Sequence, residues 1–219
     1  MKNGDFIKID YVGRLESGEI FDLTSETLAK KEHIFNPNIH YKPVPVVVGA
    51  GFVIPGLDKA LLDVDVGGKK NVTVSPTEGF GDRDPKLVRV VQKKVFKDQQ
   101  VEPKPGLVVD FSGIKGRVQS VAAGRVTIDF NNPLAGKKLN YELTVTTCIT
   151  NPEEQAKAIF EFFGVEKASV TFKDGTAEIE AAALPSDLKE RIAKLVLDHV
   201  KPDGKGLENV TFIEVFRKK

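Results

Sequence analysis

The sequence has few of the side chains on which covalent and metal-dependent chemistry relies. Cys148 is the one cysteine, so no disulfide can form within the chain, and this usage is typical of a reducing compartment. Residues 143–149 have the pattern of a buried strand, and no neighbour that would activate the thiol is visible. We therefore interpret Cys148 as a structural residue and not as a nucleophile.

Metal and nucleotide sites lack their sequence signatures as well. The three histidines, His33, His40 and His199, are scattered and form no zinc-spaced group. No Gly-x-Ser-x-Gly elbow or Walker loop is present, and Gly49-Ala50-Gly51 has no third glycine at the spacing of a dinucleotide fingerprint. We expect no cofactor and no metal site, so any catalysis should need neither a nucleophile nor a nucleotide.

Charge excess and long apolar runs are missing too. The formal net charge is +1 and no basic block occurs, which argues against a nucleic-acid partner. No apolar stretch reaches the roughly 18 residues of a membrane span, and residues 1–6 contain no apolar region of the kind that a signal peptide needs. We therefore expect a cytoplasmic protein with no membrane partner.

Hydrophobic residues make up 41% of the chain, which is enough to build packed cores. Residues 6–12 approximate the period-two alternation of a strand, and residues 16–19 have the pattern of a hairpin turn before a return strand at Ile20. Residues 24–43 are polar and irregular, so we expect a surface loop with one helical turn at 26–31. Strands are predicted at 44–48 and 70–75, on either side of a short helix at 54–62 with a proline near its start.

A second strand-rich stretch covers residues 82–131. Its strands are predicted at 87–91, 107–111, 117–121 and 125–130, and a long apolar strand follows at 139–149. Asn151 and Pro152 then have the pattern of a capped helix start, and Asp174-Gly175 has that of a hairpin turn. With an amphipathic helix at 184–200 and a strand at 210–216, residues 151–219 are predicted to form a small α+β domain of order α-β-β-α-β.

Several short motifs, each weak alone, occur in one order along the chain. They are Tyr11-Val12-Gly13-Arg14-Leu15, Gly18-Glu19-Ile20-Phe21-Asp22, and the segments 51–61, 66–70, 74–81 and 139–145. Together they resemble the FKBP family of peptidyl-prolyl cis–trans isomerases over residues 1–83 and 131–148. The middle stretch, with residues 132–137, resembles the insert-in-flap region of SlyD-like FKBPs. The 24–43 loop and the C-terminal extension resemble the long-type FKBPs of archaea.

The resemblance implies an α+β fold class. It consists of an FKBP-like antiparallel sheet wrapped on a short helix, an inserted small β-rich domain and a C-terminal α+β domain. The domains implied are a discontinuous isomerase domain at 1–83 and 131–149, an insert-in-flap chaperone domain at 84–130, and a C-terminal domain at 151–219. SlyD-like proteins use the insert to hold unfolded chains.

By the same resemblance, aromatic and aliphatic side chains line the isomerase pocket around one carboxylate. They are Tyr11, Phe21, Asp22, Val53, Ile54, Leu57, Phe80 and Tyr141. The position of Leu57 is often tryptophan in the family, that of Tyr141 is usually phenylalanine, and Phe80 replaces a more common tyrosine whose hydroxyl could bond a substrate carbonyl. We expect a functional site that is weaker for macrolides and small peptides.

Several roles stay open at this point. Asp22 could orient Tyr11 through a hydrogen bond, face the twisted amide electrostatically, or serve only as a structural acceptor. For Phe21 and Val53 the residue pattern alone favours plain core packing, and the resemblance favours the pocket. In the insert, Val90 and the set Val91, Val95 and Phe96 could form a client-binding surface, an ordinary small core, or both.

The predicted function is that of an FKBP-type peptidyl-prolyl cis–trans isomerase and folding chaperone. Its substrates would be prolyl bonds of unfolded or partly folded proteins. The alternative is a non-catalytic holdase that retains the FKBP fold. Expected partners are unfolded or proline-containing polypeptide clients and FK506-like macrolides, and a homodimer through the C-terminal domain is a further hypothesis. Residues 215–219 lack the histidine- and cysteine-rich metal tail of some SlyD-like proteins.

Overall fold

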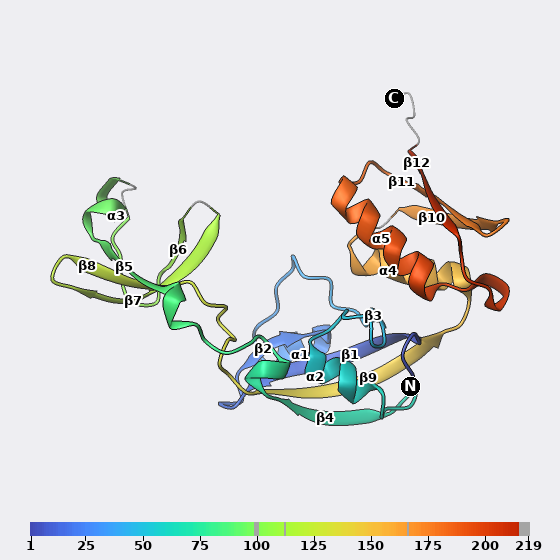
Figure 1. The fold of residues 1–219 in the computed structure, drawn as a ribbon. Helices are drawn as coiled ribbons and strands as arrows, with labels where there is room; N and C mark the ends of the chain where they lie inside the picture. The colour runs from blue at the N-terminus through green and yellow to red at the C-terminus, as the bar shows by residue number, and fades with distance from the viewer. Residues whose placement is uncertain (99–100, 112, 166, 215–219) are drawn as a thin grey trace. The chain divides into compact units, whose positions relative to one another are not determined.

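The computed structural model describes residues 1–98, 101–111, 113–165 and 167–214. It has a mixed α+β fold and divides into two compact units. The first unit joins Met1–Val74 to Leu139–Lys219, and the second is Ser75–Lys138. Each unit has its own hydrophobic core, so each is described by itself (Figure 1).

An antiparallel sheet of five strands forms the base of the first unit. Its strands are β1 (Phe6–Leu15), β2 (Ile20–Leu23), β3 (Val44–Val47), β4 (Lys69–Val74) and β9 (Leu139–Ile149). The order is β2-β1-β9-β4, and β3 pairs with the first half of β1 while β2 pairs with its second half. The central pair, β1 and β9, runs from Phe6 opposite Ile149 to Leu15 opposite Leu139, and its register shifts by one residue between Lys8 and Ile9. The long strand predicted at 139–149 is confirmed.

Two short helices accompany this sheet. The predicted turn at 26–31 is α1 (Glu26–Lys31), and the Ser25 side chain caps it by accepting a hydrogen bond from the Leu28 N–H at 3.3 Å. The helix α2 (Pro55–Leu61) begins with a proline, whose missing N–H costs nothing in the first turn. Residues 57, 60 and 61 of α2 are buried, so this helix packs one apolar face against the sheet.

The C-terminal part of the first unit has the predicted element order. Its elements are α4 (Pro152–Phe162), β10 (Ala168–Lys173), β11 (Thr176–Ala181), α5 (Ser186–His199), the short 3-10 helix η3 (Pro202–Gly204) and β12 (Asn209–Glu214). The Asn151 side chain caps α4 by accepting from the Glu154 N–H at 3.1 Å, as expected. The strands β10 and β11 are antiparallel, whereas β11 and β12 are parallel. Residues 215 and 216 of the predicted last strand lie outside the described residues.

The C-terminal elements share a hydrophobic core with the first sheet. Ile159 and Phe160 of α4 are buried in one cluster with Phe6, Val47 and Ile149 of the sheet. The same cluster continues through the inner faces of β10, β11 and α5. The C-terminal segment therefore packs directly on the edge of the sheet that holds β3.

The second unit is a four-stranded antiparallel sheet with one short helix. The sheet order is β5 (Val88–Gln92), β8 (Arg125–Asp129), β7 (Ile114–Ala122) and β6 (Val108–Phe111). The helix α3 (Lys94–Asp98) follows β5, and two 3-10 turns, η1 (Pro76–Glu78) and η2 (Pro85–Leu87), precede it. The four strands were predicted within a residue or a few of their observed bounds. The helix α3 was not predicted, because five residues are too few for a helical period to show.

Burial decides the alternative left open for Phe96 and Val90, and it corrects one expectation, that for Cys148. Phe96 is 1% exposed and lies at the centre of the core of the second unit, so it is no client-binding residue. Val90, by contrast, is 60% exposed, because it lies on the face of β5 opposite the core. Cys148 lies in β9 as expected, but its side chain is exposed, because residue 148 falls on the outer face of the strand.

The described residues lack two features, a helix that could cross a membrane and a cluster of metal ligands. None of their helices has the length and the hydropathy needed to cross a membrane. Nor do these residues contain a group of three or more His, Cys, Asp or Glu side chains placed to hold a metal ion.

Candidate functional site

The candidate site begins at an irregularity in the pairing of β1 with β2. Gly13 lies opposite Asp22 and the next residue, Arg14, lies opposite Ile20, so Phe21 is an extra residue in β2. Such a bulge re-aims side chains that would otherwise alternate between the two faces of a sheet. Neighbouring residues Phe21 and Asp22 can thus both serve one site.

Asp22 is joined to Tyr11 of β1. The Tyr11 hydroxyl donates a hydrogen bond to Asp22 Oδ2 at 2.9 Å. Burial, the negative charge of Asp22 and this hydrogen bond all hold the pKa of Tyr11 well above its ordinary value of 10.0. The phenol therefore stays protonated in neutral solution and remains a donor to the carboxylate.

Tyr141 of β9 forms the floor between these residues. Its ring meets Phe21 edge-on at a centroid distance of 5.6 Å and meets Tyr11 edge-on at 6.1 Å. Edge-to-face pairs of this kind are favourable beyond the area they bury. Tyr141 is 5% exposed, and burial together with the charge of Asp22 raises its pKa to about 12.

Gly13 makes this arrangement sterically feasible. A Cβ at this position would lie 2.6 Å from Phe21 Cζ and 3.0 Å from Tyr141 Cε1. The two rings therefore occupy the space above Gly13 that a side chain would fill. Gly13 belongs to the motif Tyr11-Val12-Gly13-Arg14-Leu15, from which no role for it was predicted. Its position inside a strand was the available signal, because an isolated strand glycine often marks a close approach.

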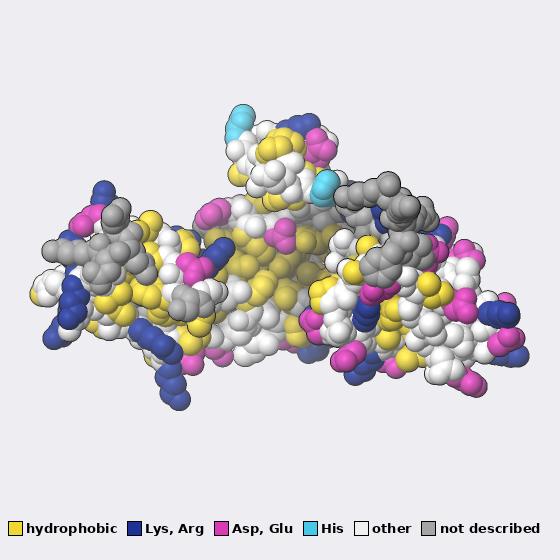
Figure 2. All heavy atoms as spheres, turned by 90° about the horizontal axis from the view of Figure 1, so that it is seen from above, with side chains coloured by type: hydrophobic (Ala, Val, Ile, Leu, Met, Phe, Trp, Pro, Cys, Tyr) yellow, Lys and Arg dark blue, Asp and Glu magenta, His cyan; other side chains and the backbone are white. Residues whose placement is uncertain are grey.

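The aliphatic residues of the predicted pocket lie at the start of α2. Val53 packs against the same hydrophobic cluster as Tyr11. Ile54 is the N-cap of α2, and Leu57 is buried in its first turn. In the view of Figure 2, hydrophobic side chains gather in a recess over the sheet of the first unit. Seven of the eight predicted site residues thus lie in the first unit.

Phe80, the eighth, belongs to the second unit. It follows η1 in the segment Glu78-Gly79-Phe80-Gly81, and its side chain is 37% exposed. Its place in the pocket remains a prediction.

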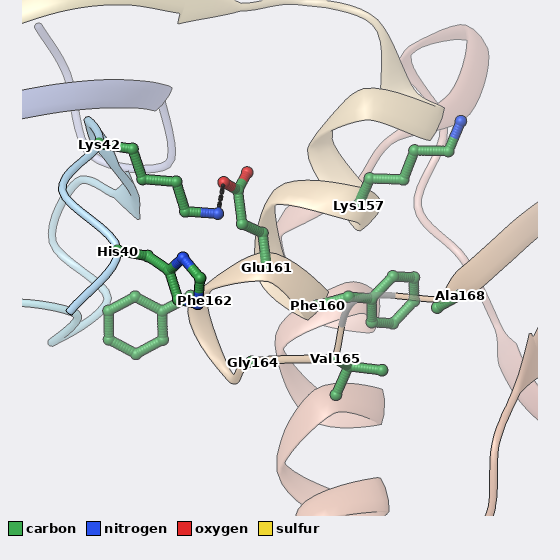
Figure 3. A pocket seen from close by; sticks show the side chains of 9 residues that line it. All are labelled: His40, Lys42, Lys157, Phe160, Glu161, Phe162, Gly164, Val165 and Ala168. Atoms are coloured by element: carbon green, nitrogen blue, oxygen red, sulfur yellow. Dashed lines mark ion pairs between the residues drawn. The ribbon is translucent and has the colours of Figure 1, made fainter. Parts of the chain in front are cut away.

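Two cavities lie elsewhere in the first unit. One of about 580 Å³ is lined by residues of the 24–43 loop and of α4, including His40, Lys42 and Glu161 (Figure 3). Another of about 380 Å³ is bordered by Phe52, Phe162 and residues of α5. Neither contains the predicted isomerase residues.

In chemical terms the site combines protonated phenols and apolar rings around one carboxylate. Tyr11 and Tyr141 are too weakly acidic to exchange protons near neutral pH, so neither is suited to general acid–base catalysis there. Such a site suits a reaction that changes the shape and polarity of a bound group without transferring a proton.

Comparison with known proteins decides the family. A family model described as FKBP-type peptidyl-prolyl cis-trans isomerase matches residues 1–102. A short-type peptidyl-prolyl cis-trans isomerase of Methanocaldococcus jannaschii is 37% identical over 145 residues, which make up 66% of this chain and 92% of the relative. The chain belongs to the FKBP family. It is a peptidyl-prolyl cis–trans isomerase of that type.

Further matches place this FKBP among those with an insert. A second family model, described as FKBP26, IF domain, matches residues 89–134, which lie in the second unit. An FKBP-type isomerase named SlyD from Treponema pallidum is 31% identical over 143 residues, covering 64% of this FKBP and 73% of the relative. The FK506-binding protein 2 of Podospora anserina is 32% identical over 130 residues, with 57% and 63% covered.

Proposed function

We propose that this FKBP isomerises prolyl bonds at the cluster of Tyr11, Phe21, Asp22 and Tyr141, with Val53, Ile54, Leu57 and Phe80 as further walls. The observation that carries the proposal is the set of edge-to-face rings around one hydrogen-bonded carboxylate. This arrangement provides an apolar surface that can bind a proline ring, and it places a single carboxylate beside the neighbouring amide.

The chemistry of the prolyl bond explains why apolar walls are useful. Resonance gives the amide a rotation barrier of about 18–20 kcal/mol, and unaided prolyl isomerisation takes tens to hundreds of seconds. The twisted transition state has lost this resonance and is less polar at the carbonyl. A dry pocket therefore disfavours the planar ground state relative to the twisted one. A rate gain of roughly 10⁴–10⁶ corresponds to about 5–8 kcal/mol.

The role of Asp22 can be tested with a double-mutant cycle. The variants are Tyr11→Phe, Asp22→Leu and the pair together, compared by kcat/KM on a short prolyl peptide; leucine is close to aspartate in size and cannot accept a hydrogen bond. If Asp22 acts only by orienting Tyr11, removal of the 2.9 Å hydrogen bond from either side gives the same loss, and the double variant loses no more. If Asp22 faces the twisted amide, Asp22→Leu causes a further loss when Tyr11 is already phenylalanine.

We further propose that residues 84–130 form a chaperone domain, that residues 1–83 with 131–149 form the isomerase domain, and that residues 151–219 form a C-terminal α+β domain whose core is continuous with that of the isomerase sheet. Exposed apolar side chains in the insert support a client-binding role. Val90, Val108 and Ile114 are each more than half exposed, and Figure 2 shows hydrophobic side chains at the surface of the second unit. Tethered clients would raise the local concentration of prolyl bonds near the pocket.

The decisive experiment is refolding of a protein whose slow phase is limited by prolyl isomerisation. The full chain is compared with a variant in which a short flap replaces residues 84–130, and both are also tested on a short prolyl peptide. We expect both to turn over the peptide, and only the full chain to accelerate refolding strongly. If the full chain accelerates neither reaction but still suppresses aggregation of the client, the non-catalytic holdase is the correct function.

The same pocket is proposed to bind FK506-like macrolides, which is supported by the relative named for that property. Leu57 provides a smaller surface than tryptophan would, so we expect binding to be weak. A Leu57→Trp variant should bind more tightly, as measured by calorimetry.

We also propose that the protein is located in the cytoplasm. Fractionation that finds the protein in another compartment would contradict it.

We also propose that the C-terminal domain mediates a homodimer. Within the described residues β12 is an edge strand of its sheet, and Ile213 on it is 42% exposed. An unpaired, apolar edge favours pairing with a second chain. Equilibrium sedimentation should then show dimers that Ile213→Lys dissociates, and a monomer at high concentration would disprove the dimer.

A further inference from the structure

Phe52 connects the two hydrophobic clusters of the first unit. Its side chain packs against the cluster that Tyr11 and Val53 also join, and against the cluster that contains α4 and the C-terminal sheet. In the sequence Phe52 directly precedes Val53 and Ile54, the two pocket residues before α2. A change in the position of Phe52 is therefore transmitted through one or two peptide units to the pocket wall.

The partner of Phe52 in the C-terminal segment is Phe162, the last residue of α4. The two rings have a centroid distance of 4.4 Å and an interplanar angle of 54°. Phe162 is itself held edge-on against Phe163 at 5.3 Å, and Arg191 of α5 lies over the Phe163 ring at 5.2 Å. The contact is thus the end of a series of aromatic and cation–π contacts that begins on α5.

Ion pairs fix the end of α4 on the sheet. Glu161 accepts from Lys8 of β1 at 3.2 Å and from Lys42 of the 24–43 loop at 2.6 Å. Figure 3 shows Lys42 reaching Glu161 across the cavity beside α4. Glu161 directly precedes Phe162, so these two ion pairs hold the last turn of α4 in the position in which the Phe162 ring contacts Phe52.

The segment between β3 and α2 has other anchors in its first half, where backbone hydrogen bonds join Val48 to Gly4 and Asp5. The N–H groups of Gly49 and Gly51 donate to the two oxygens of Asp58, at 2.8 and 3.2 Å. Asp58 lies in α2, so this anchor belongs to the isomerase fold itself. It holds the first half of the segment, and Phe162 holds the second half, which contains the pocket residues.

We propose that Phe162 is a positioning residue for the prolyl-isomerase pocket: by packing on Phe52, the C-terminal segment holds Val53 and Ile54 in place. The inference rests on the proposed function for the identity of the pocket. It gives residues 151–219 a role in catalysis although none of them is among the predicted pocket residues.

The test compares three single variants by kcat and KM on a short prolyl peptide. Phe162→Ala should lower kcat/KM about 3- to 10-fold, the size expected from loss of one aromatic pair. Phe162→Leu keeps an apolar contact and should recover most of the activity. Phe172→Ala is the matched control, because Phe172 is a partly buried residue of β10 that packs against the same cluster as α4; it should leave kcat/KM within twofold.

A spectroscopic readout separates positioning from loss of stability. The δ1-methyl NMR signal of Ile54, assigned by its absence in Ile54→Val, should shift in Phe162→Ala and not in Phe172→Ala. A folded Phe162→Ala protein with wild-type kcat/KM and an unshifted Ile54 signal would overturn the proposal. So would equal effects of Phe172→Ala on both readouts, because they would indicate a general loosening of the C-terminal segment.

Two further measurements cover the cases in which Phe162→Ala does not fold or the wild type has no activity. If Phe162→Ala does not fold, the cycle of Phe52→Leu, Phe162→Leu and the double variant decides: losses that are not additive support coupling through Phe52, and additive losses refute it. If the wild-type chain does not turn over the peptide, the proposed function fails. The Ile54 signal then decides alone whether Phe162 positions the segment.

Discussion

The geometry of the site predicts a large loss of activity for Gly13→Ala. The added Cβ would lie 2.6 Å from Phe21 Cζ, 2.9 Å from Phe21 Cε2 and 3.0 Å from Tyr141 Cε1. Gly13 is outside the left-handed region, so alanine meets no backbone strain there and the effect is purely steric. The Phe21 ring must move by about 0.8 Å to restore an ordinary contact of 3.4 Å.

The size of the effect follows from this displacement. Overpacking of this kind costs about 1–3 kcal/mol of stability. A shift approaching 1 Å in a group that contacts the reacting bond can cost up to about 100-fold in rate. We therefore expect kcat/KM on a short prolyl peptide to fall about 10- to 100-fold at a temperature where the variant is still fully folded.

Gly116→Ala supplies the control. Its Cβ would lie 2.6 Å from Ile128 Cγ2 and 2.8 Å from the Phe130 ring, a comparable clash in the core of the second unit. It should destabilise the protein to a similar degree, measured by urea unfolding, and leave short-peptide turnover within twofold. Wild-type kcat/KM in Gly13→Ala would show that the rings above Gly13 are not part of the working site.

Three further predictions concern pH and the insert. The pKa of Tyr141 is about 12 in the folded protein against 10.0 when unfolded, so the contribution of Tyr141 to stability is complete below pH 10 and up to about 3 kcal/mol of it is lost as pH rises to 12. In urea unfolding, Tyr141→Phe should lose less stability than the wild type over this range by up to that amount, while the raised pKa of Tyr11 leaves both proteins with a further loss. Burial raises the pKa of Glu161, but the hydrogen bonds and charges of Lys42 and Lys8 outweigh burial, so the pKa lies below its ordinary value of 4.5. Acidification below pH 4.5 should therefore destabilise the wild type by about 1 kcal/mol more than it destabilises Glu161→Gln. Phe96→Ala should cost the second unit about 3–5 kcal/mol, removing catalysis of protein refolding and sparing peptide turnover, and a normal refolding rate would contradict this.

Sequence reasoning predicted elements well wherever local chemistry decides them. Asn151 and Pro152 start α4, and Asp174 and Gly175 turn the β10–β11 hairpin with positive φ at both residues, because capping and turn preferences act within a few residues. It left burial undecided where burial depends on distant segments. Phe96 could have been surface or core, and only the packing of α3 against the sheet of the second unit decides that it is core.

The candidate site lies at the limit of what periodicity can predict. A regular strand places neighbours such as Phe21 and Asp22 on opposite faces, so alternation alone would assign one to the core and the other to solvent. The bulge opposite Gly13 removes that alternation, and its presence is set by the pairing of β2 with β1 rather than by either strand alone. The family resemblance did assign both Phe21 and Asp22 to one site, because family motifs preserve the result of strand pairing. A physical derivation from sequence would have needed to connect two observations: a glycine inside one strand, and an aromatic–acidic pair in the next.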